Sequence, residues 1–146
     1  MQKRDRENKR EYFYSTCKEH GLKITPQREA IYLEIADSRT HPTADQLYNV
    51  IAKKFPNISY DTVNRTLNTL ARIGLIDIIE GYGNPRRYDS NSKSHHHLHC
   101  VRCGKVIDFY NSEFDKLDIP KDIPKTFEII SKRVILGGIC SDCKKK

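Results

Sequence analysis

The chain has 146 residues, of which 37% are apolar and 31% charged, a composition typical of a soluble globular protein rather than a disordered one. Its formal net charge of +7 favours a polyanionic partner such as nucleic acid. No apolar run approaches the roughly 20 residues of a membrane span, and the charged N-terminus has no apolar segment that would make it a secretory signal. We therefore expect a cytoplasmic protein with no membrane association.

Four helices are expected in the first half of the chain. Residues 5–20 form a charged helix that ends at Gly21, which suits the left-handed C′ position. Thr25 is a good N-cap and Pro26 is preorganised for the first helical turn, so a second helix runs to about Asp37. Apolar residues recur along it at helical spacing and predict a buried face.

The third and fourth helices follow a polar loop. Residues 43–46 read TADQ, a capping box that opens a helix, and Pro56 ends that helix. Ser59 caps the next one, and Gly74 ends it. Apolar side chains at helical spacing predict that one side of each helix is buried.

A β-hairpin is expected directly after these helices. Residues 75–79 are rich in β-branched side chains, residues 80–85 form a turn, and residues 86–88 begin a return strand. Three helices followed by a hairpin are typical of a winged helix-turn-helix domain. The last helix of such a domain reads base edges in DNA, although an ordinary solvated helix face is the alternative. Its exposed side chains include Tyr60, Asn64, Arg65 and Asn68.

The second half of the chain is expected to form a smaller α/β unit. A polar, serine-rich linker at residues 90–94 precedes it. Strands are predicted near residues 97–100 and 105–109, a short helix at 111–118, and a longer strand at 126–136. The expected fold class is therefore α+β.

Two Cys-x-x-Cys pairs provide the strongest chemical signal in the sequence. In a reducing cytoplasm such pairs indicate metal ligands before disulfides, and four thiolates complete one tetrahedral zinc site. Such a site has no open position for water, which argues against a hydrolytic enzyme. We predict a structural zinc site, with a redox dithiol pair as the alternative, at Cys100, Cys103, Cys140 and Cys143.

Histidines are concentrated just before the first cysteine pair. Alternate residues of a strand share a face, so His95, His97 and His99 are expected on one side. His96 is expected on the other side. Imidazoles and nearby carboxylates together offer a sulfur-free donor set that suits Fe(II), Mn(II) or Zn(II), whereas a solvated histidine-rich loop is the alternative. The nearby carboxylates are Asp89 and Asp108.

Several motifs together resemble the ferric uptake regulator (Fur) superfamily of bacterial repressors. The resemblance extends over roughly residues 15–143, nearly the whole chain, and the spacing of the motifs is specific. The matching segments are ITPQR at 24–28, HPTADQLY at 41–48, FPNIS at 55–59, TV at 62–63, GLI at 74–76, RRYD at 86–89, HHH at 95–97, CVRCGKVIDF at 100–109 and GICSDC at 138–143.

The resemblance implies a homodimer that binds a palindromic operator in double-stranded DNA. Residues 1–89 would form the winged-helix DNA-binding domain, residues 90–94 the hinge, and residues 95–146 the dimerisation domain with its structural zinc. In the peroxide-sensing branch, three histidines and two aspartates bind a regulatory Fe(II) or Mn(II). That pattern falls here on His41, Asp89, His95, His97 and Asp108.

Two positions favour the peroxide-sensing branch over the iron-uptake branch. The iron-uptake branch usually has glutamate where this chain has Asp108, and commonly a histidine where Lys132 stands. The resemblance therefore implies a metal-dependent repressor that senses hydrogen peroxide through Fe(II)-catalysed oxidation of His41 or His95. The family's usual tyrosine in the recognition helix is replaced by Asn64, so its base contacts are not transferred to this chain.

Other interpretations are weighed against the peroxide sensor. The nearest is an iron- or zinc-responsive repressor on the same fold. A His/Asp metal site also activates water in some enzymes, but a filled five-ligand site leaves little room for a substrate, so we do not expect an enzyme. A zinc or metal-storage protein without DNA binding is disfavoured by the winged-helix pattern. Taken alone, His41 is most simply an ordinary loop residue.

Overall fold

A computed structural model describes residues 2–38, 40–81, 84–91, 93–129 and 132–146. The contacts divide the chain into two compact units, Met1–Ser92 and Lys93–Lys146, which we call the N-terminal and C-terminal units. No helix in the described ranges is both long enough and apolar enough to cross a membrane.

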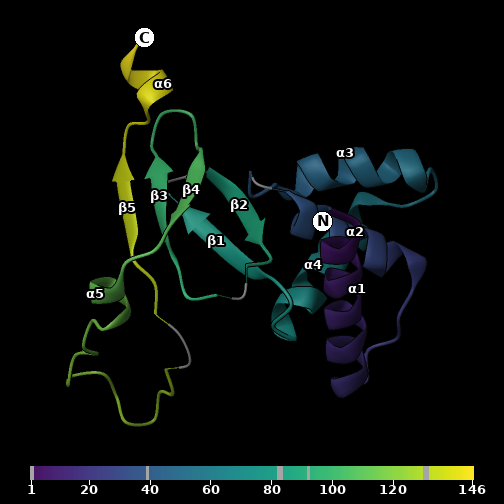
Figure 1. The fold of residues 1–146 in the computed structure, drawn as a ribbon, viewed down its shortest axis with the longest axis horizontal. Coiled ribbons are helices and arrows are strands. Elements are labelled where there is room, and N and C mark those ends of the chain that lie inside the picture. The colour runs from purple at the N-terminus through teal and green to yellow at the C-terminus, as the bar shows by residue number, and fades with distance from the viewer. Residues whose placement is uncertain (1, 39, 82–83, 92, 130–131) are drawn as a thin grey trace. The chain divides into compact units, whose positions relative to one another are not determined.

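The N-terminal unit is built from helices followed by an antiparallel hairpin (Figure 1). The helices and the hairpin expected from the sequence are confirmed, although the first helix begins earlier and the first strand later than expected. The helices are α1 (Gln2–Glu19), α2 (Pro26–Asp37), α3 (Ala44–Lys54) and α4 (Tyr60–Arg72), and the strands are β1 (Asp77–Gly81) and β2 (Asn84–Asp89).

Local chemistry sets the boundaries of these helices. Thr25 accepts a hydrogen bond from the backbone N–H of Arg28 at the start of α2. Thr43 and Gln46 form both bonds of the predicted capping box at the start of α3. Gly74, with a φ of 82°, follows the end of α4 in the left-handed conformation. Each side-chain cap satisfies a backbone donor at the helix end and is worth about 1 kcal/mol.

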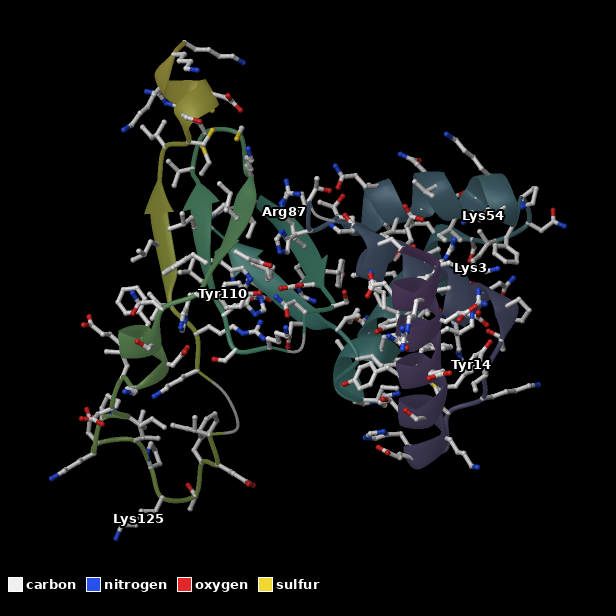
Figure 2. All side chains as sticks on the ribbon, in the orientation of Figure 1. Lys3, Tyr14, Lys54, Arg87, Tyr110 and Lys125 are labelled. Atoms are coloured by element: carbon white, nitrogen blue, oxygen red, sulfur yellow. The ribbon has the colours of Figure 1, made fainter. Side chains whose placement is uncertain are left out.

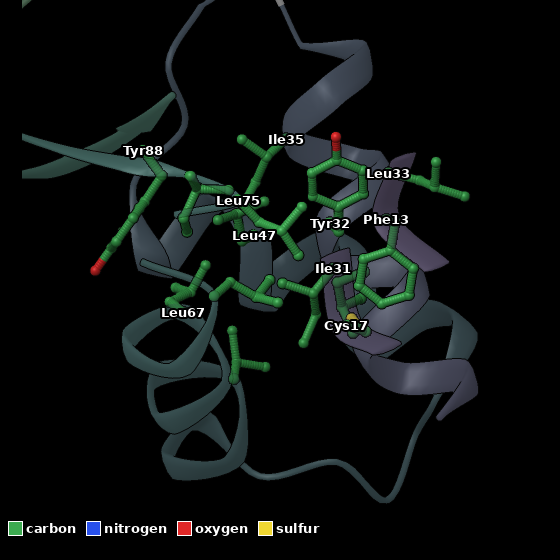
Figure 3. Packing of buried hydrophobic residues seen from close by; sticks show 14 of the residues in the cluster. Phe13, Cys17, Ile31, Tyr32, Leu33, Ile35, Leu47, Leu67, Leu75 and Tyr88 are labelled. Atoms are coloured by element: carbon green, nitrogen blue, oxygen red, sulfur yellow. The ribbon is translucent and has the colours of Figure 1, made fainter. Parts of the chain in front are cut away.

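A hydrophobic core joins the helices and the hairpin of the N-terminal unit (Figure 3). Phe13 of α1 stacks on Tyr32 of α2 with ring centroids 5.2 Å apart. Cys17 is fully buried in the same cluster, and burial raises the pKa of its thiol, which keeps it protonated. Cys17 is therefore a packing residue. The core also contains Ile31, Leu33, Ile35, Leu47, Ile51, Val63, Leu67, Leu70, Leu75 and Tyr88.

The C-terminal unit is organised around a sheet whose central strand carries the histidines. That strand, β3 (His96–Cys100), runs antiparallel to β4 (Val106–Phe109) and parallel to β5 (Ile135–Gly138) (Figure 1). The short helix α5 (Ser112–Asp115) follows β4, and α6 (Ser141–Lys144) follows β5. Because β3 is central, both of its edges are hydrogen-bonded and its side chains are held in fixed positions.

The strand expected at residues 126–136 is wrong over most of its length. The described residues of that segment before β5 are not in a strand, and residues 130–131 lie outside the described part of the chain. A β-rich composition produces a strand only where a partner edge is available, and β5 pairs only alongside β3. The helix expected at 111–118 is likewise shorter than predicted.

Candidate functional site

Four cysteines converge at one end of the C-terminal sheet. Cys100 ends β3, and Cys103 lies in the turn before β4, where Gly104 adopts a φ of 78°. Cys140 is the N-cap residue of α6, and Cys143 lies within that helix. The four sulfur atoms all lie within 4.8 Å of one another. The fold thus brings together the two Cys-x-x-Cys pairs.

The spacing of the sulfur atoms fits a tetrahedral zinc site. Zn–S bonds of about 2.3 Å place the sulfur atoms roughly 3.8 Å apart, and the Sγ atoms of Cys103 and Cys140 are 3.7 Å apart. A disulfide bond would need a separation of about 2.05 Å. Both the donor type and the spacing therefore favour zinc over a disulfide.

The pKa values of two thiols in the cysteine cluster show why the cluster needs a cation. Hydrogen bonds from the backbone N–H groups of Cys103 and Cys140 lower the pKa of Cys100 to about 5. Hydrogen bonding to the Cys140 sulfur, followed by burial, raises the pKa of Cys143 to about 12. Adjacent thiolates repel one another, so Cys100 and Cys143 are not both thiolates without positive charge between them. A divalent cation removes that conflict, and the thiols release their protons when it binds.

The histidine-rich segment is buried, so the alternative of a solvated loop is wrong. His95 and His97 each expose 1% of their surface, and His99 exposes 4%. His96 is completely buried, whereas Leu98 on the same strand is 37% exposed. Buried imidazoles need specific polar partners, and those partners separate the histidines into different roles.

His95 and His97 face a shared carboxylate. Their rings are 4.8 Å apart, and Asp108 lies opposite His97 in the register of β3 and β4. Its Oδ1 atom is 3.3 Å from His97 Nε2 and 3.7 Å from His95 Nε2. The Nδ1 of His95 donates to the carbonyl oxygen of Lys93 at 2.6 Å, which leaves Nε2 as a lone-pair donor facing the carboxylate. This arrangement fits a first-row divalent metal.

His96 points away from that group and joins three parts of the C-terminal unit. Its Nε2 donates to Asp115 Oδ1 at 2.8 Å, and its Nδ1 accepts from the backbone N–H of Val134 at 3.0 Å. Its ring packs against Phe109 and Phe114, with centroid distances of 5.7 and 5.6 Å. Because both ring nitrogens have protein partners, His96 has a structural role in this arrangement.

The N-terminal unit contains another histidine–aspartate pair. His41 and Asp89 are 7% and 6% exposed, and His41 Nε2 lies 3.7 Å from Asp89 Oδ2. The backbone N–H of Asn91 donates to Asp89 Oδ1 at 2.9 Å. His41 also has a φ of 54°, in the left-handed region that residues with a Cβ rarely adopt. Its buried position against a carboxylate makes it more than an ordinary loop residue.

The side chains predicted to contact DNA differ in their surroundings. The Tyr60 ring contacts Tyr48, with centroids 5.6 Å apart, and a hydrogen bond to Asp45 raises the pKa of the Tyr60 hydroxyl. Arg65 is exposed and its guanidinium pairs with Asp61 one turn earlier, at 2.5 Å. All members of the predicted set lie on α4: exposed Tyr60, Arg65 and Asn68, and half-buried Asn64.

A polar cavity of about 430 Å³ lies between α4 and the start of α2. Lys23, Arg28 and Arg65 give it three cationic side chains, and sequence analysis had identified only Arg65. Lys23 and Arg28 flank the Thr25 cap, and positive charge beside a capped helix start is the signal that would have found them. The complete lining is Lys23, Thr25, Gln27, Arg28, Thr62, Arg65, Thr66 and Thr69.

Comparisons with known proteins give consistent matches. Residues 19–137 match the model of the ferric uptake regulator family. The peroxide-responsive repressor PerR of Staphylococcus epidermidis is 33% identical over 132 residues, covering 90% of this chain and 88% of the relative. The solved structure of the Helicobacter pylori ferric uptake regulator Fur is similar with a TM-score of 0.77 and 26% identity, covering 97% of this chain and 95% of that one. The Campylobacter jejuni peroxide stress regulator gives a TM-score of 0.65 and 28% identity, covering 89% and 98%.

Proposed function

The chain belongs to the ferric uptake regulator family, and we propose that it is a metal-dependent DNA-binding repressor that senses hydrogen peroxide. One observation carries the proposal: the Nε2 atoms of His95 and His97 both face the same oxygen of Asp108. Imidazole nitrogens that share one carboxylate oxygen in this way offer a donor set that suits a divalent cation. Relatives named as peroxide-responsive repressors support the choice of signal.

Structural zinc is the first of two metals. Cys100, Cys103, Cys140 and Cys143 supply four thiolates, which fill a tetrahedral coordination shell. Among the described residues of the C-terminal unit, Val106 is the only buried aliphatic side chain. A unit with so little hydrophobic core needs another source of folding free energy, and zinc binding supplies it.

The regulatory metal is Fe(II) or Mn(II), and we assign it ligands from both units. His41 and Asp89 belong to the N-terminal unit, and the other three ligands to the C-terminal unit. A metal that requires both groups would hold the units in one orientation. Metal binding and DNA binding would then strengthen each other reciprocally. The proposed ligands are His41, Asp89, His95, His97 and Asp108.

The finer proposal is that peroxide is detected by oxidation of a ligand. With Fe(II) bound, hydrogen peroxide would be the two-electron oxidant: one of its oxygen atoms would be inserted into a C–H bond of a ligand imidazole and the other would leave as water, chemistry that Mn(II) supports far less readily. His41 Nε2 and His95 Nε2 each lie 3.7 Å from a carboxylate oxygen of the proposed ligand set, which supports both rings as candidates for that oxidation. Addition of one oxygen atom to either ring would weaken it as a ligand and release the repressor from DNA.

Lys132 supports the peroxide-sensing branch over the iron-uptake branch. It stands where members of the iron-uptake branch commonly carry a histidine, and its Nζ donates to the carbonyl oxygen of Leu117. An ammonium group fixed at this position repels a metal cation instead of binding it. This substitution therefore removes one ligand that the iron-uptake branch commonly uses.

Exposed aliphatic side chains on the C-terminal sheet support a homodimer. Leu98 of β3 lies opposite Ile107 of β4 and beside Leu136 of β5. These side chains expose 37%, 41% and 44% of their surface, and cross-strand neighbours share one face of a sheet. A second copy of the chain would cover this apolar row.

The N-terminal unit supplies the proposed DNA-binding surface. Arg65, Asn64 and Asn68 on α4 suit guanine and adenine edges in the major groove. The cavity beside α4 adds the positive charges of Lys23 and Arg28, which supports contacts to backbone phosphates on this side of the helix. In a dimer, two α4 helices would meet the two halves of a palindromic operator. Tyr60, the first residue of α4, stays in the proposed set.

Selection of DNA by the metal-loaded protein tests this function. Double-stranded DNA selected from a random library with Mn(II)-loaded protein should bind, and a chelator should release it. Hydrogen peroxide should release the DNA from the Fe(II)-loaded protein while the Mn(II)-loaded protein retains it. Failure to select any DNA would contradict the repressor proposal.

An iron- or zinc-responsive repressor is the second candidate. The structural similarity to the Fur protein of H. pylori favours it. Release of DNA by the chelator, without any effect of peroxide on the Fe(II)-loaded protein, would select this candidate. The family consists of transcriptional regulators, so neither candidate is an enzyme.

A further inference from the structure

We propose that Arg87 is a positioning residue for the regulatory metal, because its guanidinium holds the backbone of His41 in the conformation that directs the imidazole towards Asp89. The inference rests on the proposed function, since it concerns the two ligands that the N-terminal unit supplies. Every contact used to derive it lies within that unit. In this proposal Arg87 acts on the metal through His41 and is not itself a ligand.

The guanidinium of Arg87, whose side chain is labelled in Figure 2, donates a hydrogen bond to the loop that carries His41. Its Nη1 donates to the carbonyl oxygen of His41 at 3.0 Å and approaches the carbonyl oxygen of Thr40 at 3.5 Å. A cationic donor strengthens a hydrogen bond to a neutral carbonyl. The side chain therefore restrains the peptide unit before His41 and the one after it, and with them the backbone angle φ of His41.

The backbone of β2 reinforces this connection. Arg87 forms a β-bridge with Thr43, and the N–H of Tyr88 donates to the carbonyl oxygen of Pro42 at 3.0 Å. The strand is thus fastened to the residues immediately after His41, while the guanidinium holds His41 itself. Backbone and side chain together fix the segment that leads into α3.

The backbone at His41 requires such a restraint. Its φ of 54° makes it the one non-glycine residue with a positive φ in the described ranges. L-residues disfavour this conformation, which persists where surrounding contacts hold it in place. A return to an ordinary φ would redirect the Cα–Cβ bond and move the imidazole, whose Nε2 now lies 3.7 Å from Asp89 Oδ2.

One strand supplies both the restraint and a ligand. Side chains alternate between the two faces of a strand, so Arg87 and Asp89 project to one side of β2. Tyr88 between them projects into the hydrophobic core and is 2% exposed. The position of β2 therefore sets Asp89 and the His41 loop at the same time. Arg87 presets the separation of the two ligands before any metal binds.

The neighbouring Arg86 is a matched control. It is exposed, and its Nε pairs with Glu80 of β1 at 3.1 Å. Arg87 is half-buried and bonds to carbonyl oxygens. Removal of either side chain changes the net charge by the same amount, so the long-range repulsion of a cation and the long-range attraction of DNA change similarly. The two variants differ in whether the hydrogen bond to the His41 carbonyl oxygen is lost.

Mn(II) binding by the zinc-loaded protein without DNA tests the proposal. The EPR signal of free Mn(II) gives the dissociation constant of each variant. We expect about tenfold weaker binding in Arg87→Met, the scale found when a group that orients a metal ligand is lost. Arg87→Lys keeps one donor and should fall in between, while Arg86→Met should match the unmodified protein. Unchanged affinity in Arg87→Met would overturn the proposal.

A double variant separates positioning from general destabilisation. His41→Ala removes the ligand that Arg87 positions, so adding Arg87→Met to it should cause no further loss of Mn(II) affinity. A further loss as large as the one seen with His41 present would show that Arg87 acts elsewhere, and would overturn the proposal. Arg87→Lys in the same cycle gives the comparison if Arg87→Met does not fold.

The same variants distinguish this inference from the proposed function. Unchanged Mn(II) affinity in His41→Ala would mean that His41 is not a ligand, and both proposals would fail. Weaker binding in His41→Ala with unchanged binding in Arg87→Met would overturn the role of Arg87 alone. Loss of DNA binding by Arg87→Met at saturating Mn(II), without such a loss in Arg86→Met, would instead identify Arg87 as a DNA contact.

Discussion

The cysteine cluster and the histidine–aspartate groups are both metal-donor sets, but they are distributed differently over the chain. The four cysteines of the cluster belong to the C-terminal unit, and their sulfur atoms lie within 4.8 Å of one another. The histidines and aspartates occur as a pair in the N-terminal unit and a group of three in the C-terminal unit. Donors complete within one unit stabilise its fold, whereas donors divided between two units suit a site that regulates them.

Ligand chemistry separates the two donor sets further. Thiolates favour zinc, which has no redox chemistry of its own. Imidazole and carboxylate favour exchangeable Fe(II) or Mn(II), and Fe(II) reacts with peroxide. The cysteine cluster therefore fits a structural zinc site, and the histidine and aspartate donors fit the regulatory metal proposed above. The predictions that follow separate these two roles, starting with the largest effect.

Removal of one zinc ligand should have the largest effect. In Cys140→Ser the cluster loses a thiolate, so zinc should be lost and the C-terminal unit should unfold or become monomeric. Zinc content and sedimentation velocity measure this. Cys17→Ala is the matched control, because it removes a buried thiol from the other unit and should cost about 1 kcal/mol while zinc is retained. A stable, zinc-loaded Cys140→Ser dimer would contradict the scaffold role.

Removal of the Asp108 carboxylate should abolish the proposed sensing of peroxide and leave the structural zinc site intact. Asp108→Ala should weaken Mn(II) binding on the order of 100-fold with unchanged zinc content, as measured by titration calorimetry and metal analysis. Asp118→Ala, at an exposed carboxylate, is the control. Asp108→Glu has a longer side chain and should change the preference between metals or the reaction with peroxide. Unchanged behaviour of both Asp108 variants would exclude Asp108 as a ligand.

His96 tests whether neighbouring histidines on one strand belong to different roles. His96→Leu leaves the partly buried N–H of Val134 without its acceptor and should cost about 1–3 kcal/mol of unfolding free energy. Chemical denaturation of the zinc-loaded protein measures the loss. Asp115→Asn keeps an oxygen acceptor for His96 and should cost less. Loss of Mn(II) binding without any loss of stability would place His96 with the regulatory ligands.

Arg65 tests the DNA-binding face while leaving both metals in place. Arg65→Ala should weaken operator binding by about 1–3 kcal/mol and leave Mn(II) affinity unchanged. Its exposed pair with Asp61 contributes little to stability, so folding should be unaffected. Fluorescence anisotropy with labelled operator DNA measures the change, with Lys54→Ala at the end of α3 as the control. Equal operator affinity would remove Arg65 from the interface.

Features that depend on residues close together in the chain are predicted correctly from the sequence. Thr25, Thr43 and the glycine after α4 cap their helices as expected, because capping involves residues within one turn. The cysteine spacing likewise predicts the sulfur cluster, because metal-ligand geometry restricts how Cys-x-x-Cys pairs are used.

Features that depend on contacts between residues far apart in the chain are not predicted from the sequence. The strand expected at 126–136 fails because its extent depends on the edge of β3. The structural role of His96 depends on Asp115 and Val134, which lie far away in the chain. The bond from Arg87 to the His41 carbonyl spans 46 residues and involves a backbone acceptor, which no residue pattern encodes.

Peptide mass mapping of the protein after exposure to hydrogen peroxide tests the division between scaffold and sensor most directly. Protein loaded with zinc and Fe(II) should gain the mass of one oxygen atom on the peptide that contains His41 or on the one that contains His95. Protein loaded with zinc and Mn(II) should not. Oxidation confined to the cysteine peptides, whichever metal is bound, would contradict this account and make the zinc cluster the peroxide sensor.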